Sequence, residues 1–298
     1  MNNVSINGVI TPTEQAVVSV MDHGFLYGMG LFETFRTYRG RPFLLDKHMR
    51  RLQAGCQSLG IQWNETADQV CQQIAELMQA NQLAEAYIRY TVSAGEDILG
   101  LPSGPYTQPT IVIYAKPLPL ALQGNTQERL SGKSKALRRL HTVRNTPEGD
   151  IRFKSLHYMN SILGKRELAL YNDQPSASVE GLMLTAEGHL AEGIVSNLFF
   201  VQEDCLYTPS VDTGILPGIT RSYIIELAEQ LELPVEKGLY NWQQLQRANE
   251  IFMTNSIQEL VPITVLLDDD HEIPVSGGQP GRWTTALYEA YEKEACQP

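Results

Sequence analysis

One lysine in the sequence stands where its amine can act as a nucleophile. Lys154 follows a run rich in proline and glycine, residues 145–150, and precedes an expected helix with Leu156, Met159 and Leu163 on one face. Apolar neighbours on both sides should draw the amine out of bulk water. Desolvation or a nearby cation lowers the pKa of a lysine, which makes it available for a Schiff base. An exposed lysine in front of a helix is the alternative reading, and the rest of the chain must decide.

Other polar residues suit an anion or a buried carboxylate. Gly218 and Thr220 precede a clear helix, whose free N–H groups and dipole favour negative charge. The strand at residues 250–256 ends in small polar residues that supply further donors. Glu192 stands at a strand start, where it is either a rim carboxylate or a buried one that needs a cationic partner. Arg89 in mid-strand is either edge decoration or a carboxylate ligand.

A histidine and an arginine share one face of an expected helix. His48 and Arg51 lie three residues apart, so they point the same way. The pair is either a solvated basic edge or an anion clamp, in which the arginine supplies a forked donor.

Hydrophobic periodicity predicts the elements that position these residues. We expect Asp46 to cap the helix that carries Arg51, Asn64 to begin the next helix, and Ser155 to cap the helix after Lys154. Alternation and turn signals predict strands at residues 4–10 (a hairpin at Asn7-Gly8), 17–20, 31–38, 86–93, 110–115, 135–143, 181–185, 194–202, 205–207 and 250–256. A change in composition predicts a small N-terminal domain at 1–117, an interdomain linker at 118–133 and a large C-terminal domain at 134–298.

Composition bounds the class of protein. The chain has 298 residues, 43% hydrophobic and 19% charged, which is typical of one large or two medium globular domains. The net charge of -11 argues against a nucleic-acid surface, but local arginines can still hold a small anionic substrate. The sequence predicts no signal peptide and no membrane span. The scattered cysteines predict neither a metal site nor disulfides, and they favour a cytoplasmic location; they are Cys56, Cys71, Cys205 and Cys296.

Taken in order, several motifs resemble those of the fold-type IV pyridoxal-phosphate enzymes. This family includes branched-chain aminotransferases, D-amino acid aminotransferases and aminodeoxychorismate lyases. The matching motifs are His48 to Leu52, Lys154 with Tyr158, Ala191 to Asn197, Thr208-Pro209 and Leu216 to Arg221. The resemblance covers nearly the whole chain. It implies a mixed α+β and α/β fold like that of D-amino acid aminotransferases, with a small N-terminal α+β domain and a larger β-rich C-terminal domain with helices.

The resemblance also implies a cofactor, pyridoxal 5'-phosphate, and a role for each matching residue. Lys154 is implied to bind the cofactor, Arg51 its phosphate, and Glu192 to keep the pyridine nitrogen protonated. The other implied cofactor contacts are Tyr158 near the ring hydroxyl (one residue off the family spacing), Leu216 against the ring face, Ile219 and Thr220 at the phosphate-binding helix, and Ser256 and Ile257 in a second phosphate loop. The chemistry agrees, because a pyridinium ring is an electron sink and a lysine freed from its Schiff base can move protons at the substrate carbon.

Within the family, four stretches look most like aminodeoxychorismate lyases. They are residues 22–28, 32–36, 144–149 and 253–256. Branched-chain enzymes usually carry glycine where Thr34 stands, and the Arg-x-His pair of D-amino acid aminotransferases is absent from residues 87–95. Thr34 is therefore predicted to narrow the site and to place a hydroxyl near the cofactor ring, as a catalytic residue together with Lys154.

Three functions follow from the resemblance. The first is a lyase of folate biosynthesis that eliminates pyruvate from 4-amino-4-deoxychorismate and leaves 4-aminobenzoate, with Lys154 removing a proton and no keto acid required. The second is a branched-chain or D-amino acid aminotransferase, which needs a keto acid and gives ping-pong kinetics. The third is a small-ligand-binding protein that kept the fold without catalysis.

The resemblance further implies a homodimer, since dimeric members complete their sites with a loop of the neighbouring subunit. The Gly- and Pro-rich segment 96–105 is the candidate loop. The substrate of the predicted lyase is a dianion, and Tyr27, Arg89 and Arg152 are the predicted substrate-binding residues. No nucleic acid or membrane is expected among the partners.

Overall fold

The computed structural model describes residues 1–119, 123–171, 178–268 and 271–295. The chain divides into two compact units. The N-terminal unit consists of Met1–Leu120 and Phe153–His157, and the C-terminal unit consists of Ala121–Arg152 and Tyr158–Pro298. Lys154 thus belongs by its contacts to the N-terminal unit, although it follows the first strand of the C-terminal one. Among the helices of the described residues, none has the length and apolarity to span a bilayer.

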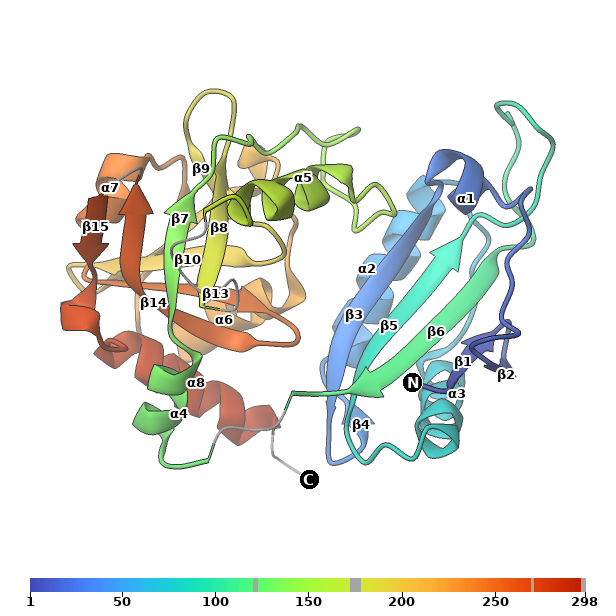
Figure 1. The fold of residues 1–298 in the computed structure, drawn as a ribbon, viewed down its shortest axis with the longest axis horizontal. Coiled ribbons are helices and arrows are strands. Elements are labelled where there is room, and N and C mark those ends of the chain that lie inside the picture. Colours follow the sequence, from blue (N-terminus) through green and yellow to red (C-terminus); the bar gives the residue numbers. More distant parts are fainter. Residues whose placement is uncertain (120–122, 172–177, 269–270, 296–298) are drawn as a thin grey trace. The chain divides into compact units, whose positions relative to one another are not determined.

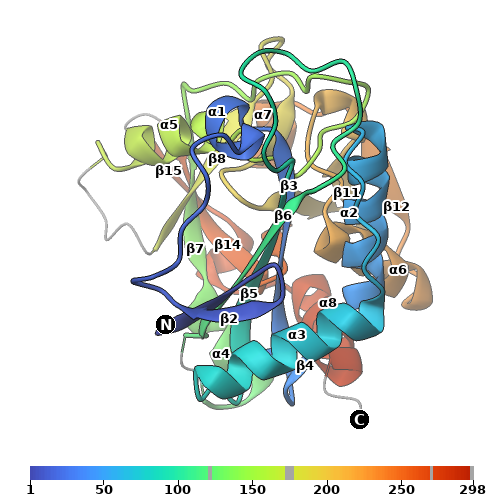
Figure 2. The same ribbon diagram turned by 90° about the vertical axis from the view of Figure 1, so that its right-hand side faces the viewer.

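The N-terminal unit is a six-stranded antiparallel sheet with helices packed on one face (Figures 1 and 2). The strand order is β2-β1-β6-β5-β3-β4. The strands are β1 (Asn3–Ile6), β2 (Val9–Pro12), β3 (Gly30–Tyr38), β4 (Arg41–Pro42), β5 (Ala86–Ser93) and β6 (Thr110–Pro117); the helices are α1 (His23–Tyr27), α2 (Leu45–Ser58) and α3 (Ala67–Ala80). Contacts of α2 with β3, and of α3 with β1 and β6, bury the apolar face of each helix.

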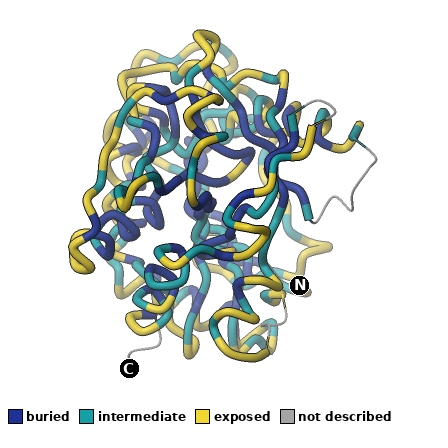
Figure 3. Tube along the Cα trace, turned by 90° about the vertical axis from the view of Figure 1, so that its left-hand side faces the viewer, coloured by how far each residue is buried: buried dark blue, intermediate teal, exposed yellow. Residues whose placement is uncertain are grey.

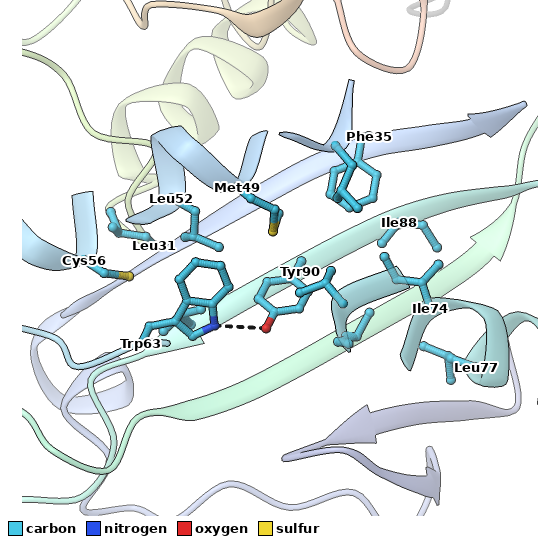
Figure 4. Packing of buried hydrophobic residues seen from close by; sticks show 14 of the residues in the cluster. Leu31, Phe35, Met49, Leu52, Cys56, Trp63, Ile74, Leu77, Ile88 and Tyr90 are labelled. Carbon is cyan, nitrogen blue, oxygen red and sulfur yellow. Dashed lines mark hydrogen bonds between the residues drawn. The ribbon is translucent and has the colours of Figure 1, made fainter. Parts of the chain in front are cut away.

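Alternate side chains along β5 point to the two opposite faces of the sheet. Ile88, Tyr90 and Val92 are buried under the two helices, and the Trp63 indole N–H donates to the Tyr90 hydroxyl at 3.1 Å (Figure 4). The residues between them, including Arg89, point to the opposite face because side chains alternate along a strand. This opposite face carries Arg89 and its cross-strand partner Thr34, two of the residues that the sequence predicts for the site.

The C-terminal unit is built on a nine-stranded mixed sheet (Figure 1). Its order is β12-β11-β10-β13-β14-β7-β8-β9, with β15 beside β14. Glu192 in β9 pairs with Asn197 in β10, so the strands from β10 round to β9 close on themselves. The strands are β7 (Lys135–Arg139), β8 (Val179–Leu184), β9 (Leu190–Gly193), β10 (Asn197–Gln202), β11 (Cys205–Pro209), β12 (Val235–Gly238), β13 (Glu250–Asn255), β14 (Glu259–Asp268) and β15 (His271–Pro274).

Helices cover this sheet, whose central strands are almost wholly buried (Figure 3). Near-continuous apolar runs such as Leu198 to Val201 are typical of strands covered on both faces. The helices are α4 (Thr126–Lys133), α5 (Met159–Leu168), α6 (Ile219–Gln230), α7 (Trp242–Gln246) and α8 (Arg282–Ala295), with short 3-10 turns at Val211–Thr213 and Ser276–Gly278. The mixed fold predicted from the sequence is confirmed.

Several local predictions are confirmed and others are wrong. The hairpin at Asn7-Gly8 forms, with both residues at positive φ. Residues 17–20 form no strand. Asp46 lies in the first turn of α2 and does not cap it, because Leu44 holds that place at φ 55°. The helix expected from Asn64 begins at Ala67, where Thr66 and Gln69 make a reciprocal capping box.

The polar run at 118–133 contains a helix. In α4, Asn125 accepts from the backbone N–H of Glu128 while the Glu128 side chain accepts from the N–H of Asn125. Residues 120–122 lie outside the described residues. The composition that suggested a linker is therefore also that of a short, well-capped surface helix.

Candidate active site

Lys154 is held in an extended segment that pairs with the edge of β3. The Phe32 N–H donates to the Lys154 carbonyl at 2.9 Å, and the Leu156 N–H donates to the Gly30 carbonyl at 3.1 Å. Ser155 forms the antiparallel bridge to Leu31. The predicted cap at Ser155 is therefore wrong, because backbone pairing with a strand keeps the chain extended there. Helix α5 begins later, at Met159, and has no side-chain cap.

The ring of Phe32 lies beneath two cations. The Lys154 Nζ is 4.6 Å from the ring centroid, and the Arg89 guanidinium carbon is 3.6 Å from it. Phe32 itself is 1% exposed, and Lys154 is half-buried. A cation over an aromatic face is attracted by the ring quadrupole. The reading of Lys154 as an exposed surface lysine is therefore wrong.

His48 and Arg51 converge on a carboxylate. Arg51 donates to both oxygens of Glu33, from Nε at 2.8 Å and from Nη2 at 2.6 Å. The His48 Nδ1 lies 2.6 Å from the same carboxylate, which can only accept, so Nδ1 carries the proton. Burial alone would raise the pKa of Glu33, but Arg51 and His48 outweigh it and lower that pKa to about 2. Burial lowers the pKa of His48, which favours its neutral imidazole.

Glu192 is a buried carboxylate with defined partners inside the C-terminal unit. Arg144 Nε donates to its Oε1 at 2.8 Å, and Arg152 Nε lies 3.9 Å from the same oxygen. Its Oε2 accepts from the Asn197 amide at 3.2 Å and from the Leu216 N–H at 3.1 Å. A carboxylate has about four lone-pair positions. Three are used by these close donors, and one remains for a further N–H.

Arg152 hydrogen-bonds to two loops near Glu192. It donates to the backbone carbonyls of Gly214 and Asn145 and is 9% exposed. Burial, together with the neighbouring Arg144, lowers its pKa. Glycine is favoured at position 214, since its φ is +74° and a Cβ would lie 3.0 Å from the Pro147 ring. The predicted substrate role of Arg152 stays a prediction.

The start of α6 and the loop after β13 form a cluster of donors. Gly218, the N-cap of α6, offers no side chain to the first-turn N–H groups, which include those of Ile219 and Thr220. The Thr220 hydroxyl lies 3.1 Å from the Ser256 hydroxyl. The Ile257 N–H donates to Asn255 Oδ1 at 3.0 Å, so a phosphate would have to share it.

The remaining predicted residues fall in different places. Thr34 pairs with Arg89 across β3 and β5, which places both on the helix-free face of the sheet. The Tyr27 hydroxyl accepts from the Gly100 N–H at 3.0 Å, and so contacts the segment 96–105. Tyr158 belongs to the C-terminal unit as the residue before α5. The predicted roles of these four residues stay predictions.

Sequence reasoning did not identify Glu33, Arg144 or Asn197 as partners in these clusters. The signal for Arg144 was available, because a buried Glu192 needs a cation. Several arginines competed for that place, however. The structure selects Arg144, whose backbone N–H donates to the Leu184 carbonyl of β8, the strand beside β9. His23 is a further buried residue that was missed. Its Nδ1 lies 3.0 Å from the Tyr106 hydroxyl, and its Nε2 lies 2.9 Å from the Ile98 carbonyl.

Solved structures define the class of protein. The branched-chain amino acid aminotransferase of T.th., in a complex with N-(5'-phosphopyridoxyl)-L-glutamate, matches with a TM-score of 0.82 and 27% identity, over 99% of this chain and 94% of that one. The fold is thus that of the fold-type IV pyridoxal-phosphate enzymes. Residues 30–266 match the family model for amino-transferase class IV, and the chain belongs to this family.

Two relatives span nearly the whole chain. The aminodeoxychorismate lyase of Bacillus subtilis (strain 168) is 40% identical over 98% of this chain and 94% of its own length. A Methanocaldococcus jannaschii protein named as a putative branched-chain-amino-acid aminotransferase is 33% identical over 97% of this chain and 95% of its own length. The resemblance read from the sequence is confirmed, and the cofactor is pyridoxal 5'-phosphate.

The residues present fit this cofactor. The uncapped N-terminus of α6 beside two hydroxyls is a donor set for a phosphate. The open lone-pair position on Glu192 can accept the N–H of a pyridinium. Glycine at position 218 also keeps Asn197 in place beside Glu192, since a Cβ there would lie 2.0 Å from Asn197 Oδ1.

Proposed function

We propose that this chain is an aminodeoxychorismate lyase, which eliminates pyruvate from 4-amino-4-deoxychorismate and leaves 4-aminobenzoate for folate synthesis. The observation that carries the proposal is the 40% identity, over 98% of the chain, to the Bacillus subtilis enzyme of that name. The sequence motifs around Thr34 and at residues 144–149 support the same choice.

We propose that the C-terminal unit holds the cofactor by its two ends. Ile219, Thr220 and Ser256, with Ile257, are proposed to bind the phosphate. Arg51 belongs to the N-terminal unit and is proposed as a further phosphate ligand only because the family resemblance implies it. Glu192 accepts the pyridinium N–H, held in place by Arg144 and Asn197. Leu216 packs against the ring and Tyr158 lies near its hydroxyl.

The proton transfer is assigned to Lys154. When bound, the cofactor stabilises negative charge at the amine-bearing carbon. The Lys154 amine takes the proton from that carbon. The bond from the ring to the enolpyruvyl oxygen then breaks, and the departing enolpyruvate gains a proton to become pyruvate. The ring becomes aromatic in the same event, so no keto acid is needed.

Residues of the N-terminal unit are proposed to recognise the substrate. Arg89 stacks 3.6 Å from the Phe32 ring centroid, and its forked donors can meet a carboxylate. Tyr27 is the other leading candidate for the two carboxylates, and Arg152, which belongs to the C-terminal unit, is the reserve. The Thr34 hydroxyl, across from Arg89, is proposed to lie near the cofactor ring.

The assembly and location are proposals of the same kind. We infer a homodimer in which the segment 96–105 completes the partner's site, since Ile98, Leu99 and Leu101 are 68%, 73% and 89% exposed. A cytoplasmic location agrees with the free thiols of Cys56, Cys71 and Cys205; Cys296 lies outside the described residues.

A transaminase is the second candidate. The observation that favours it is the TM-score of 0.82 to a branched-chain aminotransferase, together with the 33% identity to a relative named for that activity. Both activities begin with removal of the same proton. They differ in whether a leaving group departs or the cofactor accepts the amine.

One experiment separates the two candidates. Purified protein is given aminodeoxychorismate alone, and aminobenzoate fluorescence is followed; D-alanine or L-leucine with 2-oxoglutarate is then supplied instead. We expect release of aminobenzoate without any keto acid, and its loss together with the visible absorbance band in Lys154→Ala. Turnover only with 2-oxoglutarate would reject the lyase and leave the transaminase. A colourless wild type that takes up no added cofactor would reject both.

A further inference from the structure

A buried glutamate follows the proposed second phosphate loop in a left-handed conformation. Glu259 has φ +65° and is 5% exposed. Within the described ranges it is the only buried non-glycine residue at positive φ, the others lying in surface turns or at partly exposed positions. Glycine is the default residue for this conformation, because a Cβ makes it unfavourable. A strained conformation persists where its surroundings hold it, and such strain gathers at functional sites.

Two helices hold the Glu259 side chain. Lys133, the last residue of α4, makes an ion pair with its carboxylate. The Tyr288 hydroxyl, on α8, accepts from Lys133 at 2.9 Å and faces Glu259 Oε2 at 3.4 Å. Burial raises the pKa of Tyr288, so its hydroxyl keeps the proton that it donates. The carboxylate is thus fixed from two elements, both of which pack on β14.

The loop beside Glu259 is fixed at its other end as well. Asn255 pairs with Glu259 across the hairpin, and its Oδ1 accepts from the N–H groups of Ile257 and Gln258. Ser256, between them, places its hydroxyl 3.1 Å from that of Thr220 at the start of α6. Ser256 therefore lies in a short loop between two paired residues, Asn255 and Glu259.

We propose that Glu259 is a positioning residue for the cofactor phosphate. Its ion pair with Lys133 and its contact with Tyr288 hold the loop 256–258 in the path that presents Ser256 to the N-terminus of α6. The left-handed backbone at position 259 would be unstrained with glycine. Glutamate is tolerated there because its carboxylate binds Lys133 of α4 and lies beside Tyr288 of α8, and so holds the loop against these two helices. The inference rests on the phosphate site proposed above.

The chain offers a control on the same two helices. The Thr285 hydroxyl on α8 donates to the Gln127 side chain on α4 at 3.3 Å, which also joins α4 to α8. This contact does not involve Lys133, Tyr288 or Glu259. Gln127→Ala should therefore remove one link between the two helices without moving Ser256.

The test compares apoproteins binding two probes, pyridoxal 5'-phosphate and pyridoxal, by fluorescence titration. Glu259→Gly suits the backbone but removes the anchor, and Lys133→Met removes its partner. Both should weaken binding of pyridoxal 5'-phosphate about tenfold, the cost of one poorly placed charge-assisted hydrogen bond, with pyridoxal within about twofold of wild type. Lys133→Arg, which keeps a cation, should restore most of the loss. Gln127→Ala should leave both affinities near wild type.

Each other result overturns the proposal. Equal weakening for both probes in Glu259→Gly would mean that the residue serves only folding, and unchanged affinity for both would mean that it has no role in the site. Melting temperatures of the apoproteins establish that each variant is folded. If Glu259→Gly does not fold, Tyr288→Phe is the second variant, because it removes a single hydroxyl. It must then weaken binding of pyridoxal 5'-phosphate without weakening binding of pyridoxal. A wild type that binds both probes equally would reject the phosphate site itself, whichever reaction the enzyme performs.

Discussion

At the scale of single residues, the buried Glu33 should make stability depend on acid pH. Its pKa in the folded chain is about 2, below the ordinary 4.5, because Arg51 and His48 outweigh the effect of burial. A depressed pKa contributes stability that is present above pH 4.5 and is lost as the pH falls towards 2. The difference corresponds to on the order of 3 kcal/mol. We expect the free energy of unfolding of the wild type to fall by about this amount across that range.

Urea unfolding at several pH values measures this contribution. Glu33→Gln should be less stable than the wild type at about pH 5, and the gap should close as the pH approaches the folded-state pKa of about 2. Glu76→Gln, at an exposed position on α3, should follow the wild-type slope throughout. Parallel curves for Glu33→Gln and the wild type would show that the arginine and histidine do not stabilise this carboxylate.

Arg89, whose guanidinium stacks on Phe32, is expected to bind the substrate and not the cofactor. Removal of a charge-assisted hydrogen bond to a carboxylate costs about 1.5–3 kcal/mol, so Arg89→Ala should raise KM by roughly 10- to 100-fold. The affinity of the apoprotein for pyridoxal 5'-phosphate should stay near that of the wild type. Lys116→Ala is the control, because Lys116 stacks on Tyr87 in the neighbouring part of the sheet. An unchanged KM in Arg89→Ala would remove this residue from the substrate site.

The sequence pointed to candidate residues, but it did not show which residues they contact. The apolar flanks of Lys154 and the spacing of His48 and Arg51 left exposed readings open, and only the family resemblance assigned roles to Lys154 and Arg51. The carboxylate that both His48 and Arg51 contact, Glu33, lies 18 positions before Arg51 on a strand, and no local pattern links them. Pairs of this kind depend on strand and helix packing, which brings together residues distant in the chain.

At the scale of elements, the extended segment 153–157 depends on a glycine at the end of α1. Gly28 has φ +70°, and a Cβ there would lie 2.4 Å from the His157 ring. Gly28→Ala should therefore cost the left-handed penalty of about 1–2 kcal/mol and a further amount from the clash. Gly188 has φ +85° and no atom within 4 Å of a Cβ, so Gly188→Ala should cost only the left-handed backbone penalty, with no clash.

A double-mutant cycle in urea separates the two costs. His157→Ala in the Gly28→Ala background should recover part of the lost free energy of unfolding, whereas the same change in the Gly188→Ala background should recover nothing. Additive effects of Gly28→Ala and His157→Ala would mean that the segment does not rest against α1 in solution.

Element types were largely predictable and element ends were not. Periodicity correctly placed α2, α3, β3, β5 and β6, since burial of one face repeats along the chain. The predicted helix ends were wrong where tertiary contacts competed with local capping residues. Ser155 has the side chain of an N-cap, yet its backbone pairs with Leu31, and a strand bridge excludes a helix start. The capping box of α4 was present in the sequence, but its polar surroundings resembled a linker.

At the scale of the whole molecule, the apolar tip of segment 96–105 predicts an assembly. Leu99 and Leu101 are 73% and 89% exposed, and large apolar side chains gathered on one exposed segment mark an interaction site. The Tyr27 hydroxyl bonds to Gly100, so the segment is also tied to a proposed substrate residue. We therefore expect a homodimer whose formation is required for full activity.

Sedimentation at micromolar concentration tests this expectation together with activity. Leu101→Asp places a charge that would have to be desolvated in an interface, which should shift the protein towards monomer and lower turnover in parallel. Val9→Asp, at an apolar position 64% exposed in the β1–β2 hairpin, should change neither. Restored turnover of Leu101→Asp at higher protein concentration would tie activity to assembly by mass action. A wild type that sediments as a fully active monomer would reject the dimer, and the substrate site would then be complete within one chain.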